Sequence, residues 1–240
     1  MLVYDADWHT QAIIFTDSHC ENIPVLKRKQ LGVVSVEPDK YIAGWKTAEW
    51  DAIRVRLSQS EAGVWHEAFT EFFKSRLELR YLKPIKILQD NDKLQGEGFS
   101  IVAIQCSLIE FLESTAQGKN YRHWQRDVIL GTNEYSSSQT MFVDFLRNRA
   151  PFSNTFDSAS AQDFYVSVRC GLLHEAQTKN GWRIKANCPA GVVANVKDRI
   201  VYRNNFQSAL LKYVEAYGAD LQVNTDLQQA FIRKFENVCA

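Results

Sequence analysis

Apolar residues recur at steps of three and four over most of this 240-residue chain, which is the spacing of an amphipathic helix. The first long stretch begins at Ser60 and runs to Lys83-Pro84, where the proline is expected to end the helix. A polar linker over 89–98 follows. Further helices are predicted at 99–116, 138–147, 158–178, 205–217 and 225–238. The pattern predicts a mainly α fold, built as a helical bundle.

Alternating positions interrupt this pattern in two places. Residues 1 to about 45 favour strand and turn, with a short apolar run at 32–36. Near 182–203, two alternating stretches flank Pro189-Ala190-Gly191 and predict a β-hairpin, with a third strand conceivable at 198–203. We therefore expect a mixed N-terminal segment over 1–95, part strand and one long helix, whose fold the pattern does not define. A helical domain with a small β insertion is expected over 96–240.

Composition narrows the classes of function. Lys plus Arg and Asp plus Glu each total 28 residues, so no overall positive field favours nucleic acid and any RNA contact must come from a local patch. The five scattered cysteines form no C-x-x-C pair and predict neither a disulfide framework nor a metal site. With an acidic N-terminus and no apolar run of roughly 18 residues, the expected setting is cytoplasmic, without a membrane partner.

The candidate chemistry lies in one run, where Arg169 and His174 stand five positions apart in an apolar, helix-compatible segment. A guanidinium is a permanent cation that grips phosphate oxygens in a fork, and an imidazole exchanges a proton near neutral pH. On a straight helix a five-residue step separates two side chains by about 140° and about 7.5 Å. The two side chains therefore do not share a face, although Gly171 leaves room for a phosphate or a second backbone.

The run from Arg169 to His174, with Glu175 and the following Asn180-Gly181 turn, resembles the Arg-x4-6-His signature of the HEPN superfamily. The resemblance extends over roughly residues 99–235. It implies an all-helical bundle that pairs as a homodimer, with both motifs lining one cleft, and many members are metal-independent endoribonucleases. Cys170 departs from the family, because active members often carry Asn, Asp or His directly after the arginine.

Other readings of the same residues stay open. His174 could be a histidine of the helical core, and Arg169 could form an ion pair with Glu175 or Asp163. Glu110 could orient Arg169 or His174, or it could be a carboxylate at the rim of a helix stripe. We expect Glu110, Cys170 and Glu175 to support the motif pair if it is an active site.

Four arginines are candidates for RNA binding. Arg122 and Arg126 flank His123 and Trp124, a mixture that suits single-stranded RNA. The alternative is a polar loop whose tryptophan anchors it to the core. Arg199 and Arg203 could touch phosphate from the predicted hairpin, or they could be solvated strand ends.

The resemblance implies RNA cleavage through a 2′,3′-cyclic phosphate, with no cofactor, in phage defence, toxin–antitoxin pairs or stress response. RNA, a second copy of the chain and a restraining antitoxin or sensor protein are the implied partners. The alternative function is a HEPN-like module that binds RNA or protein without chemistry. A third is a helical interaction protein in which the Arg/His spacing is accidental.

Overall fold

The computed structural model describes residues 41–42, 44–59, 61–91, 95–126 and 129–240, and these are mainly helical with a few short strands. The mainly α class predicted from the sequence is confirmed at that level. Besides a long helix over 64–90 and a second helical stretch over 158–175, the described residues form five further α-helices. These are α1 (Glu49–Ser58), α5 (Glu97–Gln117), α6 (Ser138–Asn148), α9 (Arg203–Leu221) and α10 (Thr225–Cys239).

Residues 64–90 form one continuous helix in which α and π turns alternate. Its parts are α2 (Val64–Ala68), η1 (Phe69–Lys74), α3 (Ser75–Leu77), η2 (Glu78–Leu82) and α4 (Lys83–Asp90). The predicted end at Lys83-Pro84 is wrong, because the chain stays helical to Asp90. The π segment η2 ends immediately before Lys83, and a π turn relaxes the hydrogen-bond ladder where the proline lacks an N–H.

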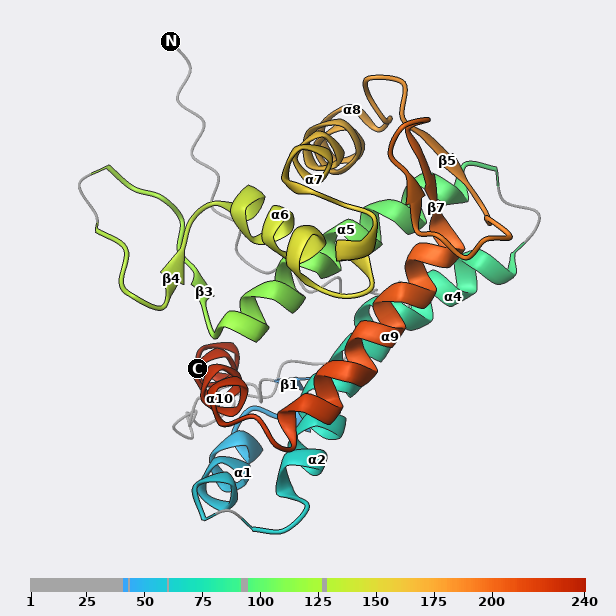
Figure 1. Ribbon diagram of the computed structural model, residues 1–240. Coiled ribbons are helices and arrows are strands. Elements are labelled where there is room, and N and C mark those ends of the chain that lie inside the picture. The colour runs from blue at the N-terminus through green and yellow to red at the C-terminus, as the bar shows by residue number, and fades with distance from the viewer. Residues whose placement is uncertain (1–40, 43, 60, 92–94, 127–128) are drawn as a thin grey trace, which may run out of the picture. The chain divides into compact units, whose positions relative to one another are not determined.

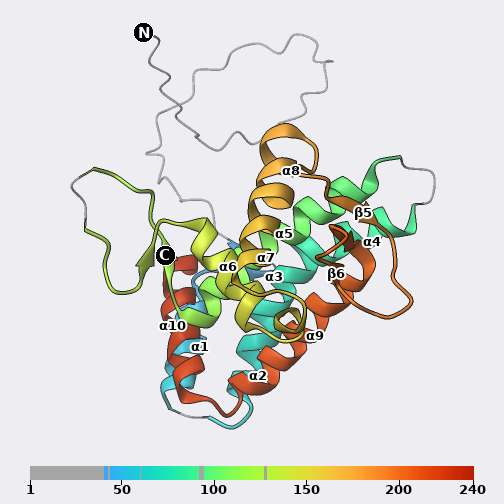
Figure 2. The same cartoon turned by 45° about the horizontal axis from the view of Figure 1, so that its top comes forward.

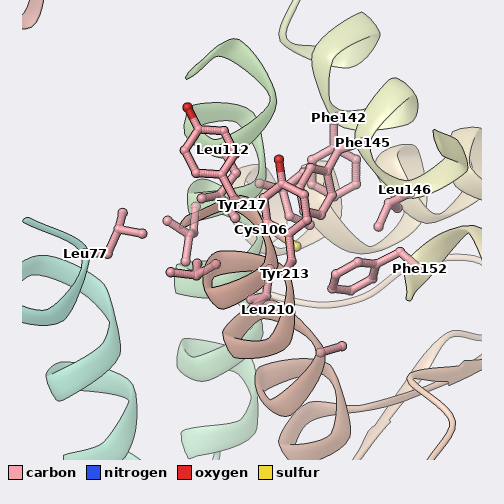
Figure 3. Packing of buried hydrophobic residues seen from close by; sticks show 14 of the residues in the cluster. Leu77, Cys106, Leu112, Phe142, Phe145, Leu146, Phe152, Leu210, Tyr213 and Tyr217 are labelled. Carbon is pink, nitrogen blue, oxygen red and sulfur yellow. The ribbon is translucent and has the colours of Figure 1, made fainter. Parts of the chain in front are cut away.

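α5 lies at the centre of the bundle, packed against α6 and α10, with α9 also in contact (Figure 1). The core is rich in aromatic rings, part of which Figure 3 shows from close by. Phe73 lies 6.0 Å from Phe111 of α5 and 6.3 Å from Phe231 of α10, between ring centroids. The hydrophobic core therefore continues across residue 95, where the sequence placed the end of the N-terminal segment.

α5 is also the described helix that is long and apolar enough, by length and composition alone, to cross a membrane. Over half of its most apolar stretch, 56%, is buried inside the protein. Burial against α6, α9 and α10 accounts for that composition and is compatible with a soluble protein.

The strand predicted at 32–36 lies outside the described residues. The first described residues, β1 (Tyr41–Ile42) and β2 (Trp45–Lys46), pair as a small antiparallel hairpin. It leads into α1.

The β insertion exists, but its pairing differs from the predicted hairpin. β5 (Arg183–Lys185), β6 (Ala194–Asn195) and β7 (Ile200–Tyr202) form a sheet of order β5-β7-β6. β7 takes the middle position, parallel to β5 and antiparallel to β6. The two stretches expected to pair with each other are thus separated by the third strand. This sheet lies at the start of α9 (Figure 1).

Between α5 and α6 the chain forms an extended arm. Its base is a short parallel pair of β3 (Asn120–Tyr121) and β4 (Glu134–Tyr135). Residues 122–126 and 129–133 of the arm lie away from the helices in both views (Figures 1 and 2).

Candidate active site on the motif helix

The helix that carries Arg169 and His174 begins at a capping box. The carboxylate of Asp157 accepts from the backbone N–H of Ser160 at 2.8 Å, and the Ser160 hydroxyl accepts from the N–H of Asp157 at 2.9 Å. These contacts satisfy N–H groups that the first helical turn leaves without partners. From there the motif helix runs through α7 (Ser158–Phe164), η4 (Tyr165–Arg169) and α8 (Cys170–Glu175).

One face of the motif helix is buried and the opposite face is open. Phe164, Val168 and Leu172 lie in the core against α5 and α6. On the other side, the side chains of Val166 and Leu173 are 43% and 61% exposed. The motif therefore sits at the edge of a packed face, and the helix carries an apolar stripe that no described residue covers.

Arg169 stands at the end of the π segment η4 and turns toward α5. Its guanidinium lies over the ring of Tyr165, 5.4 Å from the centroid, and 3.9 Å from a carboxylate oxygen of Glu110. That separation is an ion pair at its outer limit and not a hydrogen bond. Among the described residues none accepts a hydrogen bond from Arg169. A half-buried guanidinium is thus positioned while its N–H groups stay available.

Glu110 is itself held by two hydroxyls at the base of the arm. Tyr135 Oη donates to it at 3.1 Å and Ser138 Oγ at 3.0 Å. Burial and the nearby Glu110 charge raise the pKa of Tyr135, so the phenol stays protonated as a donor. The sequence offered Glu110 either as an orienting carboxylate or as a rim carboxylate. Its neighbours show that it faces Arg169 from a half-buried position.

His174 lies in the last turn of α8 and is exposed. It makes no hydrogen bond or ion pair with any residue in the described part of the chain. The alternative of a histidine buried in the core is therefore wrong. Arg169 and His174 occupy different environments, since the first is half-buried against α5 and the second is exposed.

The room provided by Gly171 is taken by the chain itself. After Ala176, which caps α8 in the left-handed region, the backbone folds back so closely that a β-carbon on Gly171 would lie 2.6 Å from the carbonyl oxygen of Gln177. The N–H of Lys179 then bonds the carbonyl of Ser167 at 2.7 Å. The returning segment is thereby hydrogen-bonded to the end of the motif helix.

Asp163 organises this return and is not a partner of Arg169. Its two carboxylate oxygens accept from Ser167 Oγ at 2.8 Å and from the indole N–H of Trp182 at 2.9 Å. Glu175 instead pairs with Lys179 at 3.1 Å on the surface. The two ion pairs that the sequence offered for Arg169 as an alternative to a site are therefore both wrong.

Cys170, beside Arg169, is half-buried. Cys106 of α5 is fully buried close to the same arginine, and burial raises the pKa of its thiol to about 12, so it stays uncharged. Nothing here gives Cys106 the character of a nucleophile.

The arginines of the arm do not converge on the motif. Arg122 lies 3.0 Å from Glu134 across the β3–β4 base, and Arg126 is exposed further out. Trp124 between them is 63% exposed. The expectation that this tryptophan anchors a polar loop to the core is wrong, because the arm carries it away from the bundle.

Arg199 and Arg203 are not simply solvated strand ends, because each contacts another part of the protein. Arg199 lies 3.8 Å from Asp163 and donates to the carbonyl of Asn180, which joins the β insertion to the motif helix. Arg203 begins α9, and its largely buried side chain bonds Glu97. A phosphate contact by Arg203 would require that pair to separate.

Three residues that support the candidate site were not predicted from the sequence. Tyr165, four positions before Arg169 on the same helix, is the aromatic support of the guanidinium, and that spacing is a usable signal. Tyr135 and Ser138 lie far from the motif in the chain, and no local sequence pattern predicts their contact with Glu110. In the described part of the chain, no three His, Cys, Asp or Glu side chains are grouped so that they could hold a metal ion.

Comparison with models of known families, with characterised proteins and with solved structures finds no match to this chain.

Proposed function

We propose that this protein is a HEPN-type endoribonuclease that cleaves RNA without a metal ion. The observation that supports this most is the state of Arg169, whose guanidinium is held by Tyr165 and Glu110 while its hydrogen-bond donors stay unused. Donors fixed in advance and aimed at developing charge stabilise a transition state. A solvent-exposed His174 on the same helix supplies an imidazole in the role of general acid or base.

In the proposed reaction a ribose 2′-hydroxyl attacks the adjacent phosphorus. The bond to the 5′-oxygen of the next nucleotide breaks, which leaves a 2′,3′-cyclic phosphate and a free 5′-hydroxyl. His174 removes the 2′ proton or donates one to the leaving oxygen, and Arg169 balances the charge on the phosphate. Because the two side chains do not meet in one protomer, the site is completed by a second copy, packed on the exposed stripe of Val166 and Leu173.

The biological setting follows from the resemblance alone. We propose a role in phage defence, a toxin–antitoxin pair or a stress response, in which an antitoxin or sensor protein restrains the nuclease. Arg122, Arg126 and Arg199 are the exposed cations proposed to guide RNA.

The test is cleavage of a labelled single-stranded RNA pool in EDTA, followed by end-group analysis. His174→Ala should lose about 10²–10⁴-fold in rate, and Arg169→Lys should also fail because lysine lacks the planar fork. His66→Ala is a matched control, since His66 is also an exposed helical histidine. Equal cleavage by wild type and His174→Ala would refute the assignment.

The second candidate is a HEPN-like module that binds RNA or protein without chemistry. It is favoured by the exposure of His174, because no described side chain fixes its tautomer, and by Cys170 next to the arginine. RNA binding that persists in His174→Ala, with no cleavage by wild type, would select this alternative.

A further inference from the structure

A cavity of about 290 Å³ lies between the ends of α5 and α6, the second half of α9 and the start of α10. It involves neither Arg169 nor His174. Its polar lining is contributed by Asn148, Arg149, Tyr213, Tyr217, Asp220 and Asn224. The volume is at the small end of ligand pockets, which suits a metabolite of few atoms.

Arg149 is locked on one side of this cavity by a buried carboxylate. Its Nε lies 2.8 Å and its Nη2 2.9 Å from the two oxygens of Glu113, which is only 1% exposed. Gln117 also donates to Glu113, at 2.7 Å. Burying such a pair costs desolvation and is weak evidence for stability, but a bidentate contact fixes the guanidinium plane. The Nη1 group bonds no described residue and Arg149 stays 34% exposed, so a fixed donor edge remains for a ligand.

Tyr213 and Tyr217 add two hydroxyls on successive turns of α9, and both hydroxyls point the same way (Figure 3). Burial raises the pKa of both phenols, so they are protonated donors. The hydroxyl of Tyr217 is buried and has no hydrogen-bond partner among the described residues. An unsatisfied buried hydroxyl costs stability, and an acceptor in the cavity would satisfy it.

Asp220 brings a negative charge to the same cavity. No ion pair joins Asp220 to Arg149 in the described part of the chain. The cavity therefore presents donors in one part and a carboxylate in another, which disfavours inorganic phosphate and suits a ligand that carries both charges.

We propose that this cavity binds a free α-amino acid, whose carboxylate contacts Arg149 and the Tyr217 hydroxyl and whose ammonium contacts Asp220. This site is independent of the proposed ribonuclease function, and either can fail without the other.

The first experiment measures the thermal unfolding of the full chain with each proteinogenic α-amino acid, with acetate, with methylamine and with inorganic phosphate. One or a few amino acids should raise the midpoint, because a ligand bound only to the folded state stabilises it, and the single-charge probes should do so far less. If no amino acid raises the midpoint, or if phosphate does so equally well, the proposal is overturned.

Variants then assign the contacts by titration of the responding amino acid. Asp220→Asn should weaken its affinity by about tenfold or more while leaving the weak acetate response unchanged. Asp226→Asn, which changes an exposed aspartate outside the lining, is the matched control. An unchanged affinity in Asp220→Asn would refute the ammonium contact and with it the proposed ligand class.

Tyr217→Phe gives a signature that a purely structural tyrosine would not. Removal of the orphaned hydroxyl should raise the unfolding midpoint of the ligand-free protein, yet weaken the amino acid about fivefold or more. A variant that is stabilised and binds as well as wild type would overturn the proposed carboxylate contact.

Discussion

Lys234 is a charged residue placed where charge is costly. It is 6% exposed on α10, its ammonium donates to the carbonyl of Lys119 at 3.0 Å, and it lies 5.7 Å from the ring centroid of Phe111. Burial lowers the pKa of Lys234 to about 8, partly opposed by the charge of Glu110. One carbonyl and one ring replace only part of the hydration that the ammonium has in the unfolded chain.

We expect Lys234 to make stability rise with pH. The folded pKa lies below the unfolded value of 10.5, so between about pH 8 and 10.5 the unfolded chain binds more protons and the free energy of unfolding increases. Below about pH 8 the cost of burying the Lys234 ammonium no longer changes with pH. At about 1.4 kcal/mol per pKa unit, this cost is at most about 3 kcal/mol. Lys234→Met should therefore be more stable than wild type near pH 7.

Urea unfolding of both proteins from pH 7 to 9.5 measures this difference. The advantage of Lys234→Met should shrink above pH 8, whereas the exposed Lys212→Met should show no such trend. A difference that is constant across the range would show that Lys234 is not desolvated in the fold.

Gly218 is required by the close approach of α9 to the π segment η1. A β-carbon at Gly218 would lie 2.5 Å from the ring of Phe69. Gly218→Ala should therefore lower the free energy of unfolding by about 1–3 kcal/mol, although alanine is the better helix former. In a double-mutant cycle, Phe69→Leu should recover part of the loss, and strictly additive effects would contradict the clash.

Among the elements, α6 offers a direct test of a predicted helix start. The helix predicted from residue 138 begins there, and Ser137 Oγ accepts from the N–H of Thr140 at 3.3 Å. Ser137→Ala should cost about 1 kcal/mol in the free energy of unfolding. Ser136→Ala, next to the cap, should have little effect in the same chemical denaturation series, and equal losses would refute the role of Ser137.

The helices were predictable because their signals are local. The spacing of apolar residues and the polar residues at helix ends involve only positions within about one helical turn of each other. As a result, α5 and α10 begin and end within two residues of the predicted bounds. The helix through Pro84 was not predictable, because the π turn before the proline packs on α5, which lies elsewhere in the chain. Hydrophobic periodicity and helix propensity contain no information about such tertiary packing.

Strand pairing illustrates the same limit. Alternation located the strands of the β insertion, but the order β5-β7-β6 depends on contacts with residues outside the insertion. Asn205, on α9, holds the β5–β6 connection by two hydrogen bonds with the backbone of Cys188, at 2.9 and 3.2 Å. Such restraints come from the tertiary fold, so a local pattern could only suggest a hairpin.

For the molecule as a whole, the candidate site was predictable in part. The spacing of Arg169 and His174 indicated two side chains that do not share a face, and the fold places one toward α5 and the other in solvent. Tyr135 and Ser138 act on Glu110 from more than twenty residues away in the chain, and only tertiary packing brings them there. The sequence therefore indicated the motif but not the arm base that supports it.

The separation of Arg169 from His174 within one chain predicts how activity is shared in a dimer. If each site takes its arginine from one protomer and its histidine from the other, mixing Arg169→Lys with His174→Ala should restore cleavage. About half of randomly mixed dimers contain both chains, and each has one intact site of two, so about a quarter of wild-type activity is expected. RNA cleavage after co-refolding of the two inactive variants measures it, with each variant refolded alone as the baseline.

Leu173→Glu supplies the control for this experiment. A charge on the exposed apolar stripe of Val166 and Leu173 should prevent pairing through the motif helix without disturbing the core, because Leu173 is 61% exposed. Added to both partners, it should give monomers in sedimentation velocity and abolish the restored cleavage. Restoration that survives in monomers would contradict a shared site, and dimers without restoration would indicate that each protomer uses its own pair.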